Sequence, residues 1–254
     1  MNEKIIGIMG AMPEEINGVV ELLLNKQEML IGGRIYFTGT INGIKTVVVF
    51  SRWGKVAAAT TVSTLILKFS ITELIFTGVA GAINAVLKIG DIVIAKRLVQ
   101  HDMDARPLMA QFEIPLLGKT YFECNERQLS IVGNAVNELL NNKHLHAIIN
   151  SSELALFNIT EPKLMIGDIA SGDQFISGTD DKNNILQKLP ETLCVEMEGA
   201  SVAQVCFEYN IPFIVVRTIS DVADEQSPID FPHFISTISN RYAVEIIKNI
   251  YLQL

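Results

Sequence analysis

The sequence predicts a mixed α/β fold, in which helices flank a sheet of parallel and antiparallel strands. Three observations lead to this expectation. Short apolar runs alternate with longer segments of helical periodicity along the chain. The pair Asn42-Gly43 stands between two strand-like runs, and it is typical of the turn of an antiparallel hairpin. The run Phe213–Ile219 is apolar and rich in β-branched residues, as in a strand buried on both faces.

The first third of the chain predicts three strands and two helices. The strand Lys4–Met9 is followed by a helix over Pro13–Leu24, because proline suits the first helical turn, where its missing N–H is not needed. Strands Ile35–Thr40 and Thr46–Ser51 flank the hairpin turn. The segment Lys55–Lys68, rich in Ala, Thr and Leu, is expected to be helical.

The rest of the chain continues this alternation. The strand Glu73–Thr77 is expected to end in a loop of small residues, Gly78–Gly81. Further strands are expected at Asp91–Leu98, Leu164–Ala170, Thr192–Val195 and Phe213–Ile219. Helices are expected at Glu126–Asn141, directly after Val195, and over a terminal segment with an apolar stripe from Phe234 to Ile250. No repeat or linker interrupts residues 1–254, so we expect a single domain.

Composition excludes several classes of protein. The formal net charge is −8 and the Lys and Arg residues are scattered, which argues against a nucleic-acid partner. The longest apolar runs fall short of the roughly 20 residues that span a bilayer, so no membrane segment is expected. Cys124, Cys194 and Cys206 form no CxxC pair and have no histidine at zinc-ligand spacing. Reduced thiols, no recognisable secretory signal and a cytoplasmic location are therefore expected.

Ligands of open α/β sheets collect at the loops that follow the carboxyl ends of strands. Two clusters of unusual residues precede the middle of the chain at such places. Glu14 and Glu15 follow the first strand, although two acids in a first helical turn also simply oppose the helix dipole. The glycines of the segment Gly78–Gly81 would allow a ligand close to the backbone, although an ordinary tight turn also explains them.

Two further clusters lie in the last third. In Val195-Glu196-Met197-Glu198 a strand runs directly into carboxylates, which are costly to bury without partners; solvated acids at a helix start are the alternative. Arg217 lies inside the most apolar strand and needs an acidic partner or ligand oxygens. Asp221 ends that strand, and capping of the next turn alone would not explain the arginine. Each of the isolated histidines is expected to be structural or solvated: His101, His144, His146 and His233.

Taken together, these motifs resemble the 5'-methylthioadenosine/S-adenosylhomocysteine nucleosidases of the purine nucleoside phosphorylase superfamily. The resemblance covers nearly the whole chain except about residues 106–163. It rests on Ile5–Met12, on Ser51 with Gly54-Lys55-Val56, on Thr77-Gly78 and Ala80-Gly81, on Ser171–Ile176, on Val195–Glu198 and on Val216–Asp224.

The resemblance implies a three-layer α/β/α fold of the nucleoside phosphorylase type, with a central mixed twisted sheet, assembled as a homodimer. It implies hydrolysis of the N-glycosidic bond of 5'-methylthioadenosine and S-adenosylhomocysteine, with release of adenine and of the 5-thioribose derivative. The expected partner is a small adenine nucleoside, and neither a metal nor an organic cofactor is implied.

The resemblance also assigns roles to individual residues. Glu15 is expected to orient and deprotonate the attacking water, and Asp221 to protonate adenine N7. An acid needs its proton at neutral pH, so we expect burial to raise the pKa of Asp221. At adenine, the expected substrate-binding residues are Phe175 and the backbone of Ile176, with Ser220 behind Asp221. At the ribose, they are Met197 and Glu198, with Arg217 on the water and sugar side. Met12 and Phe231 are expected at the 5' group, and Gly81 and Glu196 belong to the same motifs.

Other functions stay open at this point. A phosphorylase would need donors for phosphate, and Glu14 and Glu15 would repel that anion. A nucleoside-binding protein without chemistry would not need Asp221 or Glu198. Pro13 stands where the bacterial enzymes commonly have an acid, and Val79 where they have serine. The divergent segment after Pro107 leaves the 5' substituent open, including a futalosine-type group.

Overall fold

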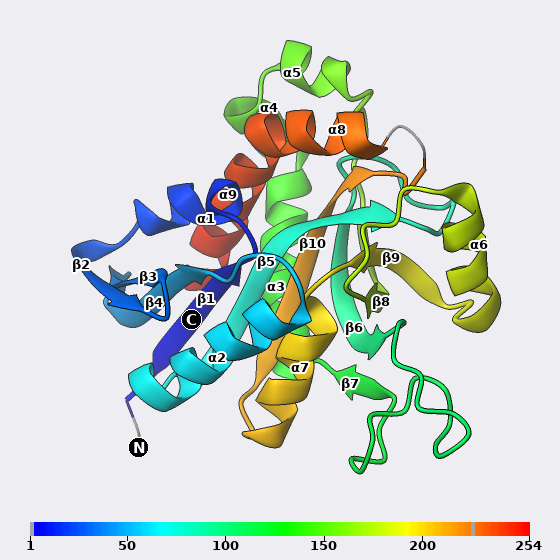
Figure 1. Ribbon diagram of the computed structural model, residues 1–254. Coiled ribbons are helices and arrows are strands. Elements are labelled where there is room, and N and C mark those ends of the chain that lie inside the picture. Colours follow the sequence, from blue (N-terminus) through cyan, green and yellow to red (C-terminus); the bar gives the residue numbers. More distant parts are fainter. Residues whose placement is uncertain (1–2, 225–226) are drawn as a thin grey trace.

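The computed structural model describes residues 3–224 and 227–254, and it has the predicted three-layer α/β/α architecture (Figure 1). A mixed sheet is formed by ten strands of the described chain. These strands are β1 (Ile5–Gly10), β2 (Leu24–Ile31), β3 (Arg34–Ile41), β4 (Ile44–Phe50), β5 (Glu73–Ala82), β6 (Ile92–Gln100), β7 (Tyr121–Glu123), β8 (Leu164–Ser171), β9 (Thr192–Glu196) and β10 (Phe213–Asp221).

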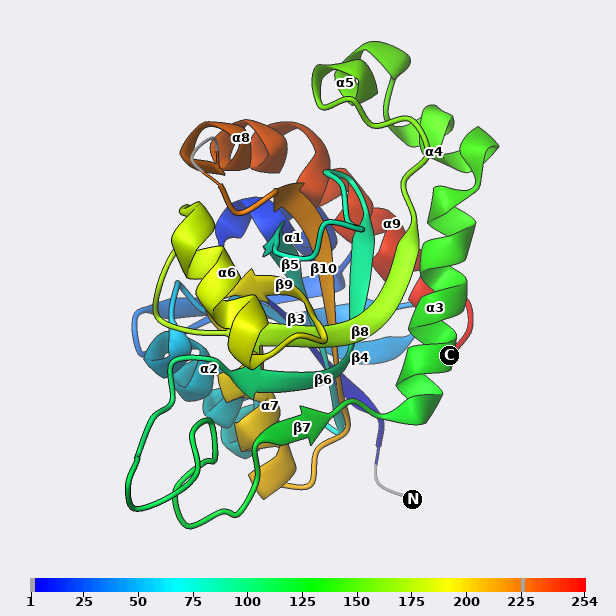
Figure 2. The ribbon, with the colours of Figure 1, turned by 90° about the vertical axis from the view of Figure 1, so that its right-hand side faces the viewer.

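Helices cover both faces of the sheet. Figures 1 and 2 show α2 and α7 together on one face, whereas α1, α3 and α9 pack together on the other. The helices are α1 (Pro13–Val20), α2 (Lys55–Phe69), α3 (Glu126–Leu140), α4 (Asn142–Ile148), α5 (Ser151–Leu156), α6 (Thr179–Lys188), α7 (Gly199–Glu208), α8 (Ser227–Phe234) and α9 (Asn240–Tyr251), with a π-helical turn, η1 (Ile235–Ser239), before the last.

The strand order brings three parallel strands to the centre of the sheet. Strand β1 pairs in parallel with β4 and with β5, and β5 pairs in parallel with β10. Strand β10 also pairs with β6, and the pairing continues through β8 and β9 back to β5, so this half of the sheet curls on itself. The carboxyl ends of β1, β5 and β10 consequently meet at one edge, where a ligand site is expected.

The hairpin predicted at Asn42-Gly43 is confirmed. Ile41 pairs with Ile44 across the turn, and the two central residues have φ angles of 47° and 78°. Positive φ at both positions is the geometry of a type I' turn, which asparagine and glycine adopt at little cost.

The end of the first helix was predicted wrongly. Helix α1 ends at Val20, and Leu24 begins β2, a strand that the sequence did not predict. Strand β2 lies at the edge of the sheet and is exposed along nearly its whole length. Since no face of it is buried, its sequence carries no alternation of apolar and polar residues, and that alternation is the signal by which strands are recognised.

The loop expected at Gly78–Gly81 is also a strand. Strand β5 continues to Ala82, because its pairing with β10 runs on through Ala80 opposite Ile219 and Gly81 opposite Asp221. Small residues resemble a turn in sequence, but here β10 pairs with them on one side, and on the other side the Val79 N–H donates to the Glu15 carboxylate.

The chain's last helical region is broken into pieces. Helix α8 precedes η1 and α9, and His233 lies in the last turn of α8. In the segment for which the resemblance gave no expectation, the helices α4 and α5 follow α3.

The core lies between the sheet and both helical layers. Apolar residues of β1, β4, β5 and β10 pack against α1, α2, α7 and α9 in one continuous cluster. The three cysteines are free and buried, in agreement with reduced thiols. Among the residues described, no helix has the length and apolar character that crossing a membrane requires.

A matched pair of substitutions in α2 tests this packing. Leu65 is completely buried, whereas Leu67 is 66% exposed in the same helix. Leu65→Ala should lower the free energy of unfolding by about 2–5 kcal/mol, because it removes buried methyl groups and leaves a cavity. Leu67→Ala should change it by less than about 0.5 kcal/mol. Urea unfolding of both variants measures the difference, and equal losses would show that α2 does not pack as described.

Candidate active site

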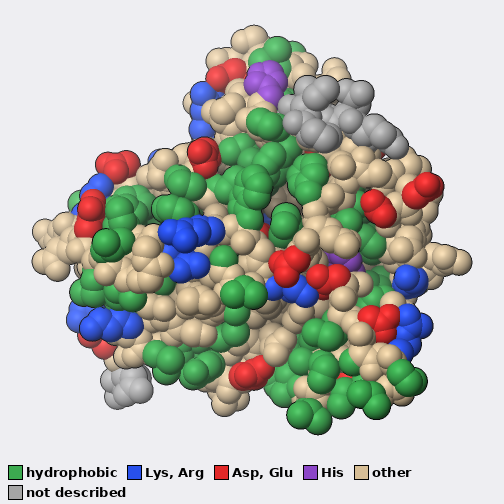
Figure 3. All heavy atoms as spheres, viewed as in Figure 1, with side chains coloured by type: hydrophobic (Ala, Val, Ile, Leu, Met, Phe, Trp, Pro, Cys, Tyr) green, Lys and Arg blue, Asp and Glu red, His purple; other side chains and the backbone are tan. Residues whose placement is uncertain are grey.

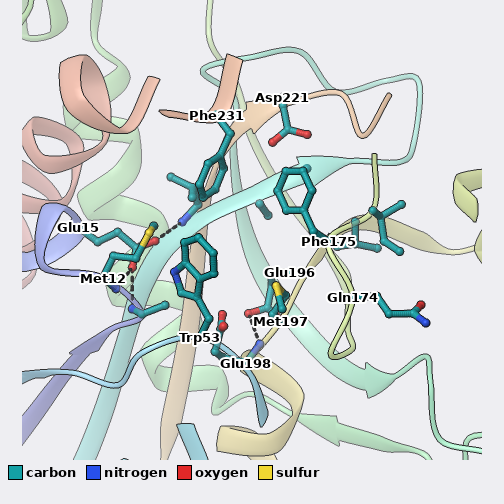
Figure 4. Close-up of a pocket in the computed structure, with 16 residues that line it drawn as sticks. Met12, Glu15, Trp53, Gln174, Phe175, Glu196, Met197, Glu198, Asp221 and Phe231 are labelled. Atoms are coloured by element: carbon teal, nitrogen blue, oxygen red, sulfur yellow. Dashed lines mark hydrogen bonds between the residues drawn. The ribbon is translucent and has the colours of Figure 1, made fainter. Parts of the chain in front are cut away.

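A cavity opens at the carboxyl ends of the central strands, and it encloses about 560 Å³ together with the open space at its mouth (Figure 4). Its wall is formed by residues of β5, β9 and β10, by the segments that follow β1, β4, β8 and β9, and by residues of α1 and α8. The lining residues are Ala11, Met12, Glu15, Trp53, Val79, Ala80, Gly81, Gln174, Phe175, Ile176, Val195, Glu196, Met197, Glu198, Asp221 and Phe231.

Glu15 is held rigidly in one wall of this cavity. It stands in the first turn of α1 and is only 2% exposed. Its Oε2 accepts hydrogen bonds from the backbone N–H groups of Ala11 (2.6 Å) and Met12 (3.0 Å), and its Oε1 from that of Val79 (3.1 Å). Burial raises the pKa of Glu15 above its usual value, although the nearby Arg217 charge and the three N–H donors oppose the rise.

Asp221 reaches the cavity from the end of β10. Its Oδ2 accepts a hydrogen bond from the Ser220 hydroxyl (2.8 Å), and its Oδ1 accepts one from the Ala223 backbone N–H (3.0 Å). The carboxyl group is buried, with 2% of the residue exposed. Figure 4 shows Asp221 beside Phe175, while Glu15 and Met12 lie across the cavity from it.

Two glycines of β5 make room for these two carboxyl groups. A Cβ atom at Gly78 would lie 2.7 Å from Oε1 of Glu15, and one at Gly81 would lie 2.9 Å from Oδ1 of Asp221. Both distances are shorter than carbon and oxygen atoms tolerate without bonding. These two glycines, which the sequence associated with close approach of a ligand, therefore leave space for the two carboxyl groups beside the strand.

Arg217 lies behind the cavity wall and is 1% exposed. Its Nη2 donates to Oε2 of Glu196 at 2.6 Å, and its guanidinium carbon lies 4.0 Å from the centre of the Phe76 ring. The acidic partner expected for a buried arginine is thus Glu196. Burial alone would lower the pKa of Arg217, but the charges of Glu196 and Glu15 outweigh it and raise that pKa, so the cation persists.

Glu196 also organises the start of α7. Its carboxylate accepts from the backbone N–H of Gly199 (2.8 and 3.0 Å) and from that of Glu198 (3.2 Å), and the Ser171 hydroxyl donates to it. The same hydroxyl accepts from the Ala200 N–H at 2.7 Å. A carboxylate at a helix N-terminus satisfies free N–H groups and opposes the helix dipole.

Glu198 faces the cavity from the loop between β9 and α7. Its Oε1 accepts a hydrogen bond from the Gly54 backbone N–H at 2.8 Å, at the start of α2. Burial raises the pKa of Glu198, and the negative charge of Glu196 raises it further.

Aromatic side chains close the remaining sides. Phe231 meets Phe175 edge to face, with ring centres 5.6 Å apart, and Trp53 lies against Phe231 in the same manner at 6.3 Å. Phe175 follows β8 in a loop with Gln174 and Ile176, and it is 47% exposed. Such rings offer apolar faces on which a flat heterocycle can stack.

The Phe175 loop is anchored to α2. The backbone N–H of Lys55 donates to Oδ1 of Asp173 at 2.8 Å, and the Lys55 ammonium group pairs with Asp102 at 2.6 Å. Oδ2 of Asp102 accepts in turn from the Asp173 N–H at 3.0 Å. The neighbouring His101 is largely buried, which lowers its pKa and favours the neutral imidazole.

The structure brings nearly all the predicted site residues together. Ten of them line the cavity, and Arg217 and Ser220 lie behind it, in contact with Glu196 and Asp221. Trp53, between the Ser51 and Gly54 motifs, also lines the cavity and was not predicted. A signal was available, since Trp53 is the chain's one tryptophan and lies two residues after the predicted strand Thr46–Ser51.

The cavity wall offers carboxylates, aromatic rings and backbone groups, without a lysine or arginine among the lining residues. Within residues 3–224 and 227–254, no group of three or more His, Cys, Asp or Glu side chains is arranged to hold a metal ion. The arrangement is suited to binding a neutral, flat, polar ligand and to moving protons at its two ends.

Comparison with known proteins identifies the family. The phosphorylase superfamily profile matches residues 5–250. The chain is 32% identical over 245 residues to the 5'-methylthioadenosine/S-adenosylhomocysteine nucleosidase of Oceanobacillus iheyensis. This alignment covers 96% of this chain and 97% of the relative. It is 34% identical over 235 residues to the aminodeoxyfutalosine nucleosidase of Helicobacter pylori, covering 91% of this chain and 90% of the relative.

Solved structures agree with this result. The S-adenosylhomocysteine nucleosidase of Streptococcus pyogenes, in complex with 5-methylthiotubericidin, is similar with a TM-score of 0.85 and 32% identity. The match covers 100% of this chain and 98% of that one. With the superfamily profile, the relatives and the fold in agreement, the chain belongs to the phosphorylase superfamily and, within it, to the nucleosidase family that includes the 5'-methylthioadenosine/S-adenosylhomocysteine nucleosidases.

Proposed function

We propose that this protein hydrolyses the N-glycosidic bond of 5'-methylthioadenosine and S-adenosylhomocysteine, releasing adenine and the 5-thioribose derivative. The observation that carries the proposal is the placement of two buried carboxyl groups, Glu15 and Asp221, on opposite sides of one cavity. The family membership and the names of the relatives support the same reaction.

The proposed reaction needs one proton at adenine and one base at water. As the bond between C1' of the sugar and N9 of the base breaks, its electron pair moves into the adenine ring. Asp221 donates a proton to N7, which makes adenine a better leaving group. A water oxygen attacks C1', and Glu15 takes the proton that this water loses. A carboxylate with a raised pKa is a stronger base than an ordinary one, which suits Glu15 to this role.

The sugar carries positive charge as the bond breaks, and the ribose side of the cavity is acidic. We assign Met197 and Glu198 to the ribose, with Glu198 on its hydroxyl groups, and Phe175 with the backbone of Ile176 to adenine. Met12 and Phe231 face the 5' group. Carboxylates fixed in a site with little water stabilise a developing cation without having to reorganise.

Water is favoured over phosphate as the nucleophile. Phosphate sites of proteins use arginine, lysine or several convergent N–H groups. Here the N–H groups of Ala11, Met12 and Val79 are already occupied by Glu15, and Arg217 is paired with Glu196 behind the wall. An anionic nucleophile would meet the buried acidic groups of Glu15 and Glu198 instead.

We further propose that the protein is a cytoplasmic homodimer. Leu108 and Leu116, in the long connection between β6 and β7, are 88% and 95% exposed, and covering such side chains by a second subunit would be favourable. Three buried free thiols are suited to a reducing compartment.

The proposal predicts release of adenine from 5'-methylthioadenosine in phosphate-free buffer, at a rate that added phosphate does not raise. Glu15→Gln and Asp221→Asn should each lower kcat by about 10²–10⁴-fold, because each removes a proton-transfer group. Adenine formation followed by chromatography measures these rates.

The matched control is Glu138→Gln, which neutralises an exposed acid on α3 and should retain the wild-type rate. A wild-type enzyme that is inactive until phosphate is added would refute hydrolysis and indicate phosphorolysis. Full activity of Glu15→Gln would remove Glu15 from the mechanism.

The buried carboxyl of Glu198 predicts a pH-dependent stability. Folding raises its pKa, so its contribution to stability is complete below the unfolded pKa and declines as the pH rises toward the folded pKa. Glu198→Gln keeps an oxygen for the Gly54 N–H and removes the decline. The variant should therefore melt above wild type at pH 8, with a smaller difference at pH 5.

Each pKa unit corresponds to about 1.4 kcal/mol, or roughly 3–5 °C in Tm for a chain of this size. Thermal unfolding at the two pH values tests this, with the exposed Glu28→Gln as a control that should follow wild type at both. A Tm difference that is the same at pH 5 and pH 8 would contradict the raised pKa.

A further inference from the structure

A second groove adjoins the active-site cavity at its 5' end. The two share Ala11, Met12, Trp53 and Phe231, so the groove begins at the wall that the proposed function assigns to the 5' substituent. It encloses about 1170 Å³, including its open mouth, and its other lining residues are Pro13, Glu14, Phe50, Arg52, Pro232, Ile235 and Ser236. In Figure 3 hydrophobic side chains gather at the centre of this face, with Lys or Arg side chains to their lower left.

The groove is larger than a methylthio group requires. That substituent adds one sulfur and one carbon to the sugar, and the shared residues Met12, Trp53 and Phe231 already provide an apolar contact for it. Beyond them the groove continues with apolar and aromatic side chains, and its charged lining residues in the described part of the chain are Arg52 and Glu14. A longer 5' substituent with a charged end would match this lining.

Arg52 is held in a backbone conformation that arginine rarely adopts. Its φ angle is 73°, in the turn between β4 and α2. Glycine and asparagine are the usual residues at positive φ. In the described part of the chain, Arg52 shares this conformation with four asparagines and with Ser70, Phe112, Leu116 and Ala223. A residue kept where its backbone is disfavoured points to a use for its side chain.

The Arg52 guanidinium group is anchored at one end only. Its Nη2 donates to the Gly33 carbonyl oxygen at 2.8 Å, which fixes the group beside the turn between β2 and β3. In the described part of the chain, no other protein acceptor bonds to it. A planar group with several free N–H donors at the edge of an apolar groove has the chemistry that binds a carboxylate through two parallel hydrogen bonds.

We propose that Arg52 is a specificity-determining residue that binds a carboxylate at the end of the substrate's 5' substituent. The inference rests on the proposed function, since it concerns the tail of the same nucleoside. The groove would hold the apolar part of the tail against Trp53 and Phe231, and Arg52 would select tails that end in an anion.

The test compares kcat/KM for adenine release from three nucleosides. These are S-adenosylhomocysteine, whose tail ends in a carboxylate, 5'-butylthioadenosine, which has a neutral tail of the same length, and 5'-methylthioadenosine. Arg52→Gln should lower the ratio of kcat/KM for S-adenosylhomocysteine to that for 5'-butylthioadenosine by about tenfold at low salt, the lower end for a hydrogen-bonded charge. Added salt should diminish this effect, because the groove is open to solvent.

A second variant separates specificity from folding. Arg52→Gly places glycine at the positive φ and should keep the wild-type Tm while lowering the same ratio. The matched control, Arg127→Gln, removes an exposed arginine on α3 and should leave the ratio as in wild type. A ratio that neither Arg52 variant changes would overturn the proposal, and so would equal losses for the charged and the neutral tail.

Two kinds of 5' substituent end in such a carboxylate, and further measurements distinguish them. An amino-acid tail also has an ammonium group, for which the exposed Glu14 is a partner, so Glu14→Gln should lower kcat/KM for S-adenosylhomocysteine relative to its neutral analogue. An aryl carboxylate tail, as in aminodeoxyfutalosine, should depend on Arg52 but not on Glu14. If wild-type enzyme releases adenine from none of these nucleosides, the proposed function itself has failed, which is evident before any variant is compared.

Discussion

The burial of one arginine governs the organisation of the site. Arg217 lies in the most apolar strand of the sheet, where an unpaired cation would be very costly. Glu196 is the direct partner of Arg217, and the charge of Arg217 also acts on Glu15 and Glu198, whose pKa values it lowers in opposition to burial. One cation cannot balance three carboxylates, so burial is only partly offset for the other two acids, and their pKa values are raised. The ionisation of the cavity wall is therefore set first by burial and is moderated by Arg217, a residue that does not line the cavity.

Much of the architecture was predictable, because buried strands carry their own signal. The apolar runs at β1, β4, β6, β8, β9 and β10 and the Asn42-Gly43 turn were recognised within a few residues of their bounds. The strand segments that the sequence did not predict either have no buried face or consist of residues with small side chains. Strand β2 is an exposed edge, and the end of β5 is built from small residues whose strand geometry is imposed by β10. Pairing with a neighbouring strand makes both segments strands, and a local sequence pattern does not reveal such pairing.

The site divides in the same way. Carboxylates at the ends of apolar strands drew attention to Glu15, Glu198 and Asp221, but ordinary explanations remained for the glutamates, and the resemblance assigned the roles. The need of Arg217 for an acid or for ligand oxygens was evident from its surroundings. That the acid is Glu196 was not evident, since in the described chain β9 and β10 do not pair with each other and meet only because both pair with the end of β5. Gly78 and Gly81 were noticed as places where a ligand can approach the backbone, but only the structure shows that they also admit carboxylates of the protein itself. Trp53 was overlooked for want of a periodic pattern around it.

Two consecutive backbone N–H groups at the start of α2 donate to side chains on different sides of the site. The Gly54 N–H donates to Glu198, on the ribose side. The Lys55 N–H donates to Asp173, which precedes Phe175 on the adenine side. One rigid helical turn thus joins the two halves of the nucleoside site. Ordering either half reduces the conformational freedom left in the other, so the sugar and the base are expected to assist each other's binding through the protein as well as through the bond between them. Cleavage of that bond would end the cooperation and favour departure of both products.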